Sequence, residues 1–342
     1  MRVVIANVSP PLESRLDYRA DWEGFEPPPL GPRHSLFEQP HDWGFHIYSI
    51  GVHLMDLGEA DRVEFWDYCE ERRVHHLSNG VLRVAFHNDE DAAAYLDETG
   101  DPDLFVNHGP EGARLLRMLE GRCFRVHVVL NLAPARHDTP AECYLVDDEG
   151  LLGERSMLYV PVVNTAQVAP ASNGSTGRDF VYLASVYAGK RHDLLLDAVR
   201  GSELTGHLHP VDDPSLLDLA GTRVTTSGFN ELDVVELLRS SRIAVYAGDH
   251  TSNPAAMWEC VAAGLPIVVN ERIAGGRHLV VPGVTGELAA PDRFREVMER
   301  VLAKRDSYRP REHFERHWDT VETIEGYLDF FERMGWDRPR CS

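Results

Sequence analysis

Three observations predict an α/β protein with two doubly wound domains. Strand-like and helix-like segments alternate along nearly the whole chain, as they do where helices connect the strands of a parallel sheet. A stretch of small and polar residues interrupts this alternation near the middle of the chain. The 342 residues, 43% of them hydrophobic, are enough to build two separate cores.

The N-terminal domain is predicted to span residues 1–168. Short apolar runs predict its strands at 2–8, 62–66, 82–86, 103–107, 124–131, 142–146 and 157–163. Helices are predicted between some of these strands, at 44–57, 89–98 and 112–120. A Pro-rich segment at 9–42 follows the first strand, and a loop of this length inside a compact domain is usually functional or mobile.

A linker is predicted at 169–178, where the chain reads Pro-Ala-Ser-Asn-Gly-Ser-Thr-Gly. The second domain then spans 179–317. Its strands are predicted at 180–185, 203–207, 222–226, 243–247, 267–269 and 286–289, and its helices at 191–200, 231–240, 253–263 and 294–304. The last segment, 318–342, carries one more amphipathic helix, which we expect to close back toward the N-terminal domain.

The composition excludes several classes of partner. The formal net charge of −21 argues against nucleic acid and anionic membranes. No apolar run approaches the roughly 20 residues of a membrane span. Residues 1–8 predict a strand rather than a signal peptide, and five widely spaced cysteines predict reduced thiols without a metal-type pair. We therefore expect a cytoplasmic monomer or homodimer without a membrane span.

The segment 249–266, Asp-His-Thr-Ser-Asn-Pro-Ala-Ala-Met-Trp-Glu-Cys-Val-Ala-Ala-Gly-Leu-Pro, is the most informative part of the chain. It predicts a loop, a short helix with Asn253 as cap and Pro254 as first residue, and a turn into a buried strand. The helix N-terminus suits a phosphate, and Glu259, one turn further in, suits sugar hydroxyls. This arrangement is typical of a nucleotide-sugar site. The alternative is an ordinary α/β crossover with a surface Glu.

Four segments in this order resemble a known family. They are residues 180–198, residues 224–239, the segment that contains Glu259, and residues 275–288. Together they look like the C-terminal domain of the retaining GT-B fold glycosyltransferases of family 4. The resemblance implies two Rossmann-like domains that face a central cleft, with the acceptor bound by residues 1–168 and the nucleotide-sugar donor by residues 179–317.

The resemblance assigns roles to individual residues. Lys190 matches the family's phosphate-binding lysine, and Glu259 matches its ribose-binding carboxylate. Gly228 and Phe229 lie where the family's nucleobase rests against the backbone. The alternatives are a solvated lysine at a helix start and a core phenylalanine. The remaining donor-side candidates are Ser185, Asp249, His250, Thr251, Ser252, Asn253, Ala255 and Ala256.

The chain departs from the family pattern at three places. Thr251 stands where the family has a Glu that holds the transferred sugar, and Ser185 stands where it has an Arg. Asn253-Pro254 replaces a Phe-Gly pair. These departures leave the identity of the sugar open and allow a reduced or unusual activity.

Neighbouring residues are candidates to replace what is missing. Arg191, directly after Lys190, is the candidate for the second cation. Asp249 or His250 is the candidate for the missing carboxylate.

The N-terminal domain carries weaker signals. His108 ends a predicted strand, where ligands of open α/β sheets bind, and the family often has a His facing the donor sugar there; the alternative is a loop histidine. The acceptor-side candidates are Trp43, Gly44 and His46. Asp21 and Trp22 lie in a segment, 17–25, that mixes carboxylates with aromatic rings. It predicts a cationic or zwitterionic acceptor, such as an aminocyclitol or a betaine, or else a solvated lid.

The expected reaction is transfer of a sugar from a nucleoside diphosphate-sugar, with UDP or GDP as nucleotide, to a small-molecule acceptor. The family implies retention and no metal or other cofactor, and the Asp147-Asp148 and Asp212-Asp213 pairs are expected to be solvated. We expect a role in specialised-metabolite (antibiotic) biosynthesis with an O- or S-linked product. The alternatives are another GT-B sugar-nucleotide enzyme (epimerase, hydrolase or phosphorylase) and a non-catalytic nucleotide-sugar-binding protein.

Overall fold

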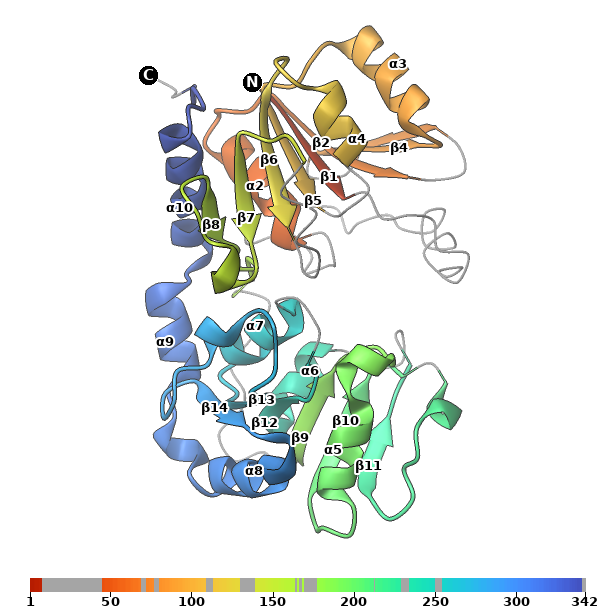
Figure 1. Cartoon of the computed structure of the whole chain (residues 1–342), viewed down its shortest axis with the longest axis vertical. Coiled ribbons are helices and arrows are strands. Elements are labelled where there is room, and N and C mark those ends of the chain that lie inside the picture. Colours follow the sequence, from red (N-terminus) through yellow and green to blue (C-terminus); the bar gives the residue numbers. More distant parts are fainter. Residues whose placement is uncertain are drawn as a thin grey trace. The chain divides into compact units, whose positions relative to one another are not determined.

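The computed structural model describes residues 1–7, 45–68, 72–76, 80–108, 113–129, 139–163, 165, 168, 177–211, 213–228, 234–249 and 254–339. The chain divides into two compact units (Figure 1). Unit 1 comprises residues 1–164 and 320–342, and unit 2 comprises residues 165–319. The C-terminal segment therefore completes the unit that the N-terminus begins.

Unit 1 contains a sheet in the order β3-β4-β2-β1-β5-β6-β7-β8. Its strands are β1 (Arg2–Asn7), β2 (Arg62–Tyr68), β3 (Arg73–His76), β4 (Leu82–Phe86), β5 (Leu104–His108), β6 (Phe124–Val129), β7 (Cys143–Val146) and β8 (Ser156–Leu158). All neighbours are parallel except β3, which runs antiparallel to β4. Strand β3 was not predicted, because this short edge strand reads Arg-Val-His-His and lacks the apolar run of a buried strand.

Helices cover both faces of this sheet. They are α2 (Phe45–Asp56), α3 (Asp89–Thr99), α4 (Ala113–Met118) and α10 (Thr320–Arg333), with a short 3-10 turn, η3, at Glu149–Leu151. Successive residues of a strand point to opposite faces, so β1 contributes to two cores. Val3 and Ile5 pack in the core beneath α2 and α10, and Val4 and Ala6 pack in the core beneath α3 and α4.

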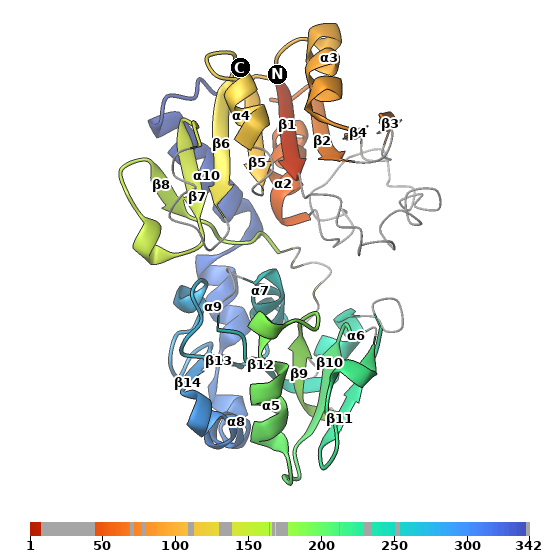
Figure 2. The same cartoon turned by 45° about the vertical axis from the view of Figure 1, so that its right-hand side comes forward.

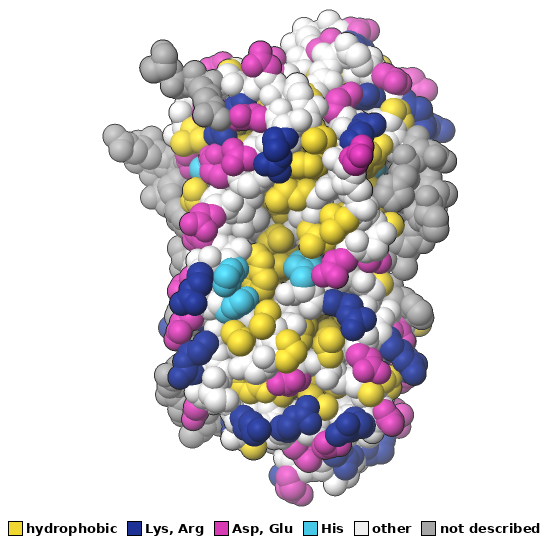
Figure 3. Space-filling view, turned by 60° about the vertical axis from the view of Figure 1, so that its left-hand side comes forward, with side chains coloured by type: hydrophobic (Ala, Val, Ile, Leu, Met, Phe, Trp, Pro, Cys, Tyr) yellow, Lys and Arg dark blue, Asp and Glu magenta, His cyan; other side chains and the backbone are white. Residues whose placement is uncertain are grey.

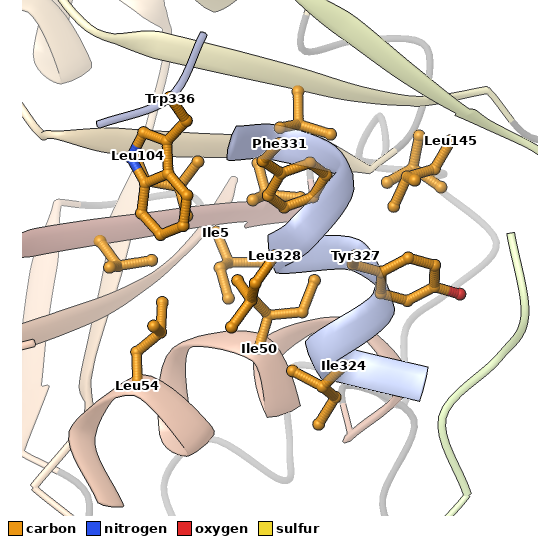
Figure 4. Close-up of a cluster of buried hydrophobic side chains, with 14 of the residues drawn as sticks. Ile5, Ile50, Leu54, Leu104, Leu145, Ile324, Tyr327, Leu328, Phe331 and Trp336 are labelled. Atoms are coloured by element: carbon orange, nitrogen blue, oxygen red, sulfur yellow. The ribbon is translucent and has the colours of Figure 1, made fainter. Parts of the chain in front are cut away.

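Helix α10 closes the first of these cores (Figure 4). Its buried residues recur at helical spacing, so that one stripe of the helix faces the sheet. They are Thr320, Ile324, Tyr327, Leu328, Phe330 and Phe331. Each large apolar side chain buried here contributes roughly 1.5–3 kcal/mol. The hydroxyl of Tyr327 also bonds to both the N–H and the carbonyl of Val160, which fixes the helix against the segment that follows β8.

Unit 2 contains a wholly parallel sheet in the order β11-β10-β9-β12-β13-β14. Its strands are β9 (Arg178–Leu183), β10 (Thr205–His209), β11 (Arg223–Thr226), β12 (Ser241–Tyr246), β13 (Ile267–Asn270) and β14 (Gly286–Ala289). The strand order reverses between β9 and β12, and in unit 1 it reverses between β1 and β5. In doubly wound sheets, ligands bind outside the carboxyl ends of the strands at this switch point.

Five α-helices among the described residues belong to unit 2, and Figure 2 shows α5 and α8 on one face of the sheet and α6 and α7 on the other. They are α5 (His192–Val199), α6 (Val234–Arg239), α7 (Ala255–Ala262), α8 (Phe294–Ala303) and α9 (Pro310–His317). The predicted start of α7 is corrected by one residue. Pro254 occupies the N-cap position in an extended conformation, and Ala255 is the first helical residue.

A charged cluster in unit 1 fastens the C-terminal segment to α2. The guanidinium of Arg338 bonds to Glu59 at 2.6 Å and to Glu325 of α10 at 2.8 Å, and Glu325 also contacts His53 of α2 at 2.6 Å. The hydrogen bond from Arg338, followed by that from His53, lowers the pKa of Glu325 to about 2. The cluster therefore favours the ionised carboxylate in the folded state.

We predict that Glu325→Gln lowers the stability of the protein at pH 7 by roughly 1–2 kcal/mol, after discounting for partial solvent screening. The pKa of Glu325 in the folded protein lies below the ordinary glutamate value of 4.5, so the contribution is complete above about pH 4.5 and is lost as the pH falls toward 2. Urea unfolding at pH 7 and 3.5 measures the difference. Asp329→Asn, on the exposed side of α10, is the control, and equal losses in both variants would contradict the prediction.

Candidate active site

The switch point of unit 2 brings two loops together. The first follows β9 and contains the 3-10 turn η4 (Ala188–Lys190), and the second follows β12 as Ala247-Gly248-Asp249. Figure 2 shows η4 and α7 at the same end of this sheet. The candidate residues Lys190, Arg191 and Asp249 therefore meet at the position where a ligand of this fold is expected.

Lys190 is a half-buried cation. Its Nζ donates a hydrogen bond to the hydroxyl of Tyr246 at 2.8 Å, and it lies 5.1 Å and 5.3 Å from the ring centroids of Tyr246 and Tyr187. Among the described residues, no carboxylate forms an ion pair with it. Burial lowers the pKa of Lys190 to about 8. A buried ammonium with no carboxylate partner favours the approach of an anion.

Arg191 is held differently. Its backbone has φ +50°, a left-handed conformation that is costly for a residue with a Cβ. The guanidinium bonds to Asp249 at 2.6 Å and to Asp193 at 2.9 Å, and these ion pairs hold the strained residue in place. The hydrogen bonds to Asp193 and Asp249 raise the pKa of Arg191. Two candidate residues for missing family functions, Arg191 and Asp249, are thus bound to each other.

Direct contacts join the two loops. The N–H of Asp249 in the second loop donates to the carbonyl of Gly189 in the first at 3.3 Å, and the hydroxyl of Tyr182 on β9 donates to the carbonyl of Lys190. Gly248 allows this approach, because a Cβ there would come within 3.0 Å of the Gly189 carbonyl and 2.8 Å of the Tyr246 ring. No sequence motif singled out Tyr182, Tyr246 or Gly248.

Helix α7 presents one face at this end of the sheet. Met257, Trp258 and Cys260 are buried, whereas Ala255, Ala256 and Glu259 are half-buried. Glu259 lies four positions after Ala255 and three after Ala256, so its side chain shares a face of the helix with both. The helix N-terminus, predicted to bind phosphate, and Glu259, predicted to bind ribose, therefore lie on the same face of α7.

A polar cluster lies at the carboxyl ends of β10 and β11. The hydroxyl of Ser227, next to the half-buried Gly228, contacts His207 at 2.8 Å and His209 at 2.9 Å. Burial, then the charges of Arg178 and His209, lower the pKa of His207 to about 4, so this ring is neutral at pH 7. The sequence signal was the alternation His-Leu-His, which places both rings on one face of a strand.

In unit 1, His108 ends β5 at the other switch point. It pairs in register with Asn7 of β1, is half-buried, and its ring lies 6.3 Å from that of Tyr159. Beside it, the buried Asn107 contacts His127 at 2.9 Å. The structure thus places His108 at the ligand-binding edge of this sheet.

The other candidates have different outcomes. Ser185 is exposed in the loop after β9, and His46 lies in α2, with its side chain outside the description. The remaining candidates lie outside the described residues: Phe229, His250, Thr251, Ser252, Asn253, Trp43, Gly44, Asp21, Trp22 and Asp212.

The expectation that Asp147 is solvated is wrong. It is 1% exposed, because it directly follows the buried end of β7. Asp148, beside it, accepts a hydrogen bond from Gly150 and caps η3. Asp213 is exposed and accepts hydrogen bonds from Ser215.

Comparison with known proteins shows the fold. No family model matches the chain, and no curated protein matches its sequence. Sucrose-phosphate synthase from Thermosynechococcus elongatus superposes with a TM-score of 0.69 at 13% identity, over 98% of this chain and 99% of its own. Anabaena HepE in complex with UDP and glucose gives 0.66 at 13% identity, over 97% and 100%.

AviGT4, a glycosyltransferase involved in avilamycin A biosynthesis, gives 0.60 at 18% identity, over 98% of each chain. TarM is longer: the match covers 75% of this chain but 60% of TarM, with a TM-score of 0.56 at 16% identity. The fold is that of the GT-B glycosyltransferases. The two doubly wound domains predicted from the sequence are therefore confirmed.

Two features of the surface and helices bear on partners. No helix among the described residues is long and apolar enough to span a membrane. Figure 3 shows acidic and basic side chains interspersed over the described residues of one face.

We predict that Lys190 titrates near pH 8 in the free protein, because burial without a carboxylate partner disfavours its charged form. Lys190 and Lys304 are the only lysines of the chain, so NMR of protein labelled with ¹³C at lysine Cε contains two lysine signals. Lys304→Ala identifies which signal belongs to Lys190. A midpoint above pH 10 for the remaining signal would contradict the prediction.

Proposed function

We propose that the protein is a glycosyltransferase that moves a sugar from a nucleoside diphosphate-sugar, carrying UDP or GDP, to a small-molecule acceptor. The observation that carries this proposal is Lys190, a half-buried ammonium at the switch point of unit 2 that has no carboxylate partner among the described residues. The GT-B fold and the solved complexes of HepE with UDP and with UDP-glucose support it.

Each part of the site has a role in this reaction. Lys190 binds the diphosphate and stabilises the negative charge that grows on it as the sugar leaves. The N-terminus of α7 points free N–H groups and a positive dipole at the same group. Glu259 accepts hydrogen bonds from the ribose, and the backbone at Gly228 borders the nucleobase. We propose that the anomeric configuration of the sugar is retained, because the family that these segments resemble is a retaining one.

Metal independence is part of the proposal. The side chain of Lys190 and the α7 dipole together supply the positive charge that a divalent ion supplies in other transferases. The matching test is turnover in EDTA, which we expect to be unchanged. Loss in EDTA and recovery with Mg²⁺ or Mn²⁺ would overturn this part of the proposal.

The ion pair between Arg191 and Asp249 bears on the departures from the family pattern. Arg191 is proposed as the second cation, since Ser185 carries no charge. Asp249, which is buried and lies two positions before Thr251 in the sequence, is the proposed replacement for the missing sugar ligand. Both roles require the nucleotide-sugar to compete with the ion pair of 2.6 Å between Arg191 and Asp249.

The product class is proposed to be a specialised metabolite with an O- or S-linkage. AviGT4, which is similar in fold, is involved in avilamycin A biosynthesis. One alternative is another GT-B sugar-nucleotide enzyme, and a second, suggested by Thr251 and Ser185, is a nucleotide-sugar-binding protein without turnover. Donor consumption with and without an acceptor separates these cases. A thermal-shift comparison of UDP, GDP, ADP, dTDP and CMP selects the nucleotide, since a ligand at 100 times its Kd stabilises by about 2.7 kcal/mol.

We predict that Lys190→Ala reduces turnover on the order of 10²- to 10³-fold, because one electrostatic contact to the leaving group is lost. Lys304→Ala, which removes the only other lysine from an exposed position at the end of α8, is the matched control and should retain activity. Steady-state rates for both variants provide the measurement. Equal rates in the two variants would refute the role of Lys190.

We predict that Glu259→Gln weakens nucleoside diphosphate binding by roughly 1–3 kcal/mol, because hydrogen bonds to a charged acceptor become bonds to a neutral one. Calorimetry with the nucleotide that the thermal-shift screen selects measures the loss. Glu299→Gln, at an exposed position of α8, is the control. Unchanged affinity in the Glu259 variant would exclude a ribose contact.

A further inference from the structure

The Lys190 ammonium stands at the end of a column of packed aromatic rings. His192 of α5 packs on Tyr182 of β9, with ring centroids 4.9 Å apart. The Tyr182 ring meets that of Tyr246 of β12 edge to face at 5.6 Å. Tyr246 then bonds to Lys190 through its hydroxyl. Tyr182, Tyr246 and His192 are all buried, so the column is anchored in the core of unit 2.

The column controls both the backbone and the side chain of Lys190. The Tyr182 hydroxyl donates to the Lys190 carbonyl. The Tyr246 hydroxyl accepts from Nζ at 2.8 Å. A lysine has a flexible four-carbon stem and about 2 kcal/mol of rotamer entropy, so fixing its tip before a ligand arrives reduces the cost of binding.

The geometry leaves the ammonium with capacity for a ligand. An ammonium has three N–H donors, and Tyr246 is the single hydrogen-bond acceptor of Nζ among the described residues. Tyr187, half-exposed on the other side, presents its ring at 5.3 Å. The remaining donors can therefore bond to phosphate oxygens while the bond to Tyr246 persists.

We propose that Tyr246 is a positioning residue, whose hydroxyl holds the Lys190 ammonium in place for the diphosphate of the donor. The proposal rests on the proposed function for the identity of the anion, but the contact that it describes belongs to the free protein. Tyr246 acts through Lys190.

The surroundings of Lys190 make this contact the one to test. The titratable groups that face it are the hydroxyls of Tyr246, Tyr182 and Tyr187, and the ring of His192. The charged groups of the adjoining residues are already paired, because Asp193 and Asp249 each bond to Arg191. Because no carboxylate takes over, loss of the Tyr246 oxygen removes the acceptor that favours the charged lysine.

The test compares Tyr246→Phe with Tyr187→Phe. Both variants keep an aromatic ring and remove one hydroxyl, but only the first removes a hydroxyl that bonds to Nζ. In the ¹³C spectrum of labelled lysine, we expect the Lys190 midpoint to fall by at least half a pH unit in Tyr246→Phe and to stay unchanged in Tyr187→Phe. We expect Kd for UDP and for inorganic pyrophosphate at pH 8 to rise three- to tenfold in Tyr246→Phe alone.

A second measurement uses the unmutated protein and so holds even if the Phe variant does not fold. Below pH 6, the hydrogen bond and burial should slow exchange of the ¹⁵Nζ ammonium protons of Lys190 relative to those of the exposed Lys304. Equally fast exchange for both lysines, or an unchanged Lys190 midpoint in folded Tyr246→Phe, would overturn the proposal.

The two proposals fail separately. If neither nucleotide nor pyrophosphate binds, but the Lys190 midpoint shifts in Tyr246→Phe, the proposed function is refuted. The contact between Tyr246 and Lys190 is then confirmed, without a nucleotide-sugar as its ligand. If UDP binds equally well to Tyr246→Phe and wild type, and both turn over the nucleoside diphosphate-sugar at equal rates, the positioning role is refuted and the proposed function stands.

Discussion

The site in unit 2 depends on the hydrogen bond from the hydroxyl of Tyr182 to the carbonyl of Lys190. Strands β9 and β12 are neighbours only because the winding of the sheet reverses between them, and this places two unconnected loops side by side. The tyrosine hydroxyl, with the bond between Asp249 and Gly189, turns that adjacency into a defined geometry. The buried hydroxyl satisfies the carbonyl of Lys190, a polar backbone group that would be costly to leave unpaired at this depth.

The two cations beside this hydrogen bond, Lys190 and Arg191, differ in whether a carboxylate balances their charge. Arg191 is bonded to Asp193 and Asp249, so its charge is compensated within the protein. Lys190 meets only phenol oxygens and ring faces among the described residues. A compensated pair contributes rigidity, whereas an uncompensated ammonium contributes an attraction that a ligand must complete. The strained backbone of Arg191 belongs to the same arrangement, because the two ion pairs hold the chain in the conformation that turns Lys190 inward.

The sequence predicted the architecture well, because apolar strand runs and linker composition are local properties. Strand β3 escaped because an exposed edge strand needs no apolar pattern. Lys190 and Glu259 could be singled out from motifs, but the contacts around them could not. Tyr182 and Tyr246 are 64 residues apart and meet only through the order of the strands, so no local spacing announces them. Asp147 was misjudged for a similar reason, since an Asp-Asp pair reads as solvated until the strand before it is known to be buried.

The departures from the family pattern follow a consistent physical logic. With Ser185 uncharged and Arg191 compensated, Lys190 is the one cation among the described residues of these two loops whose charge is not offset by a carboxylate. In the proposed function, diphosphate binding then depends most on the protonation of Lys190, whose pKa burial lowers to about 8. A second fixed arginine would hold the anion whatever the pH, but a lone buried lysine holds it strongly only below about pH 8. Because the anion in turn favours the charged lysine, binding and protonation reinforce each other, and the hydroxyl of Tyr246 sets where that coupling begins.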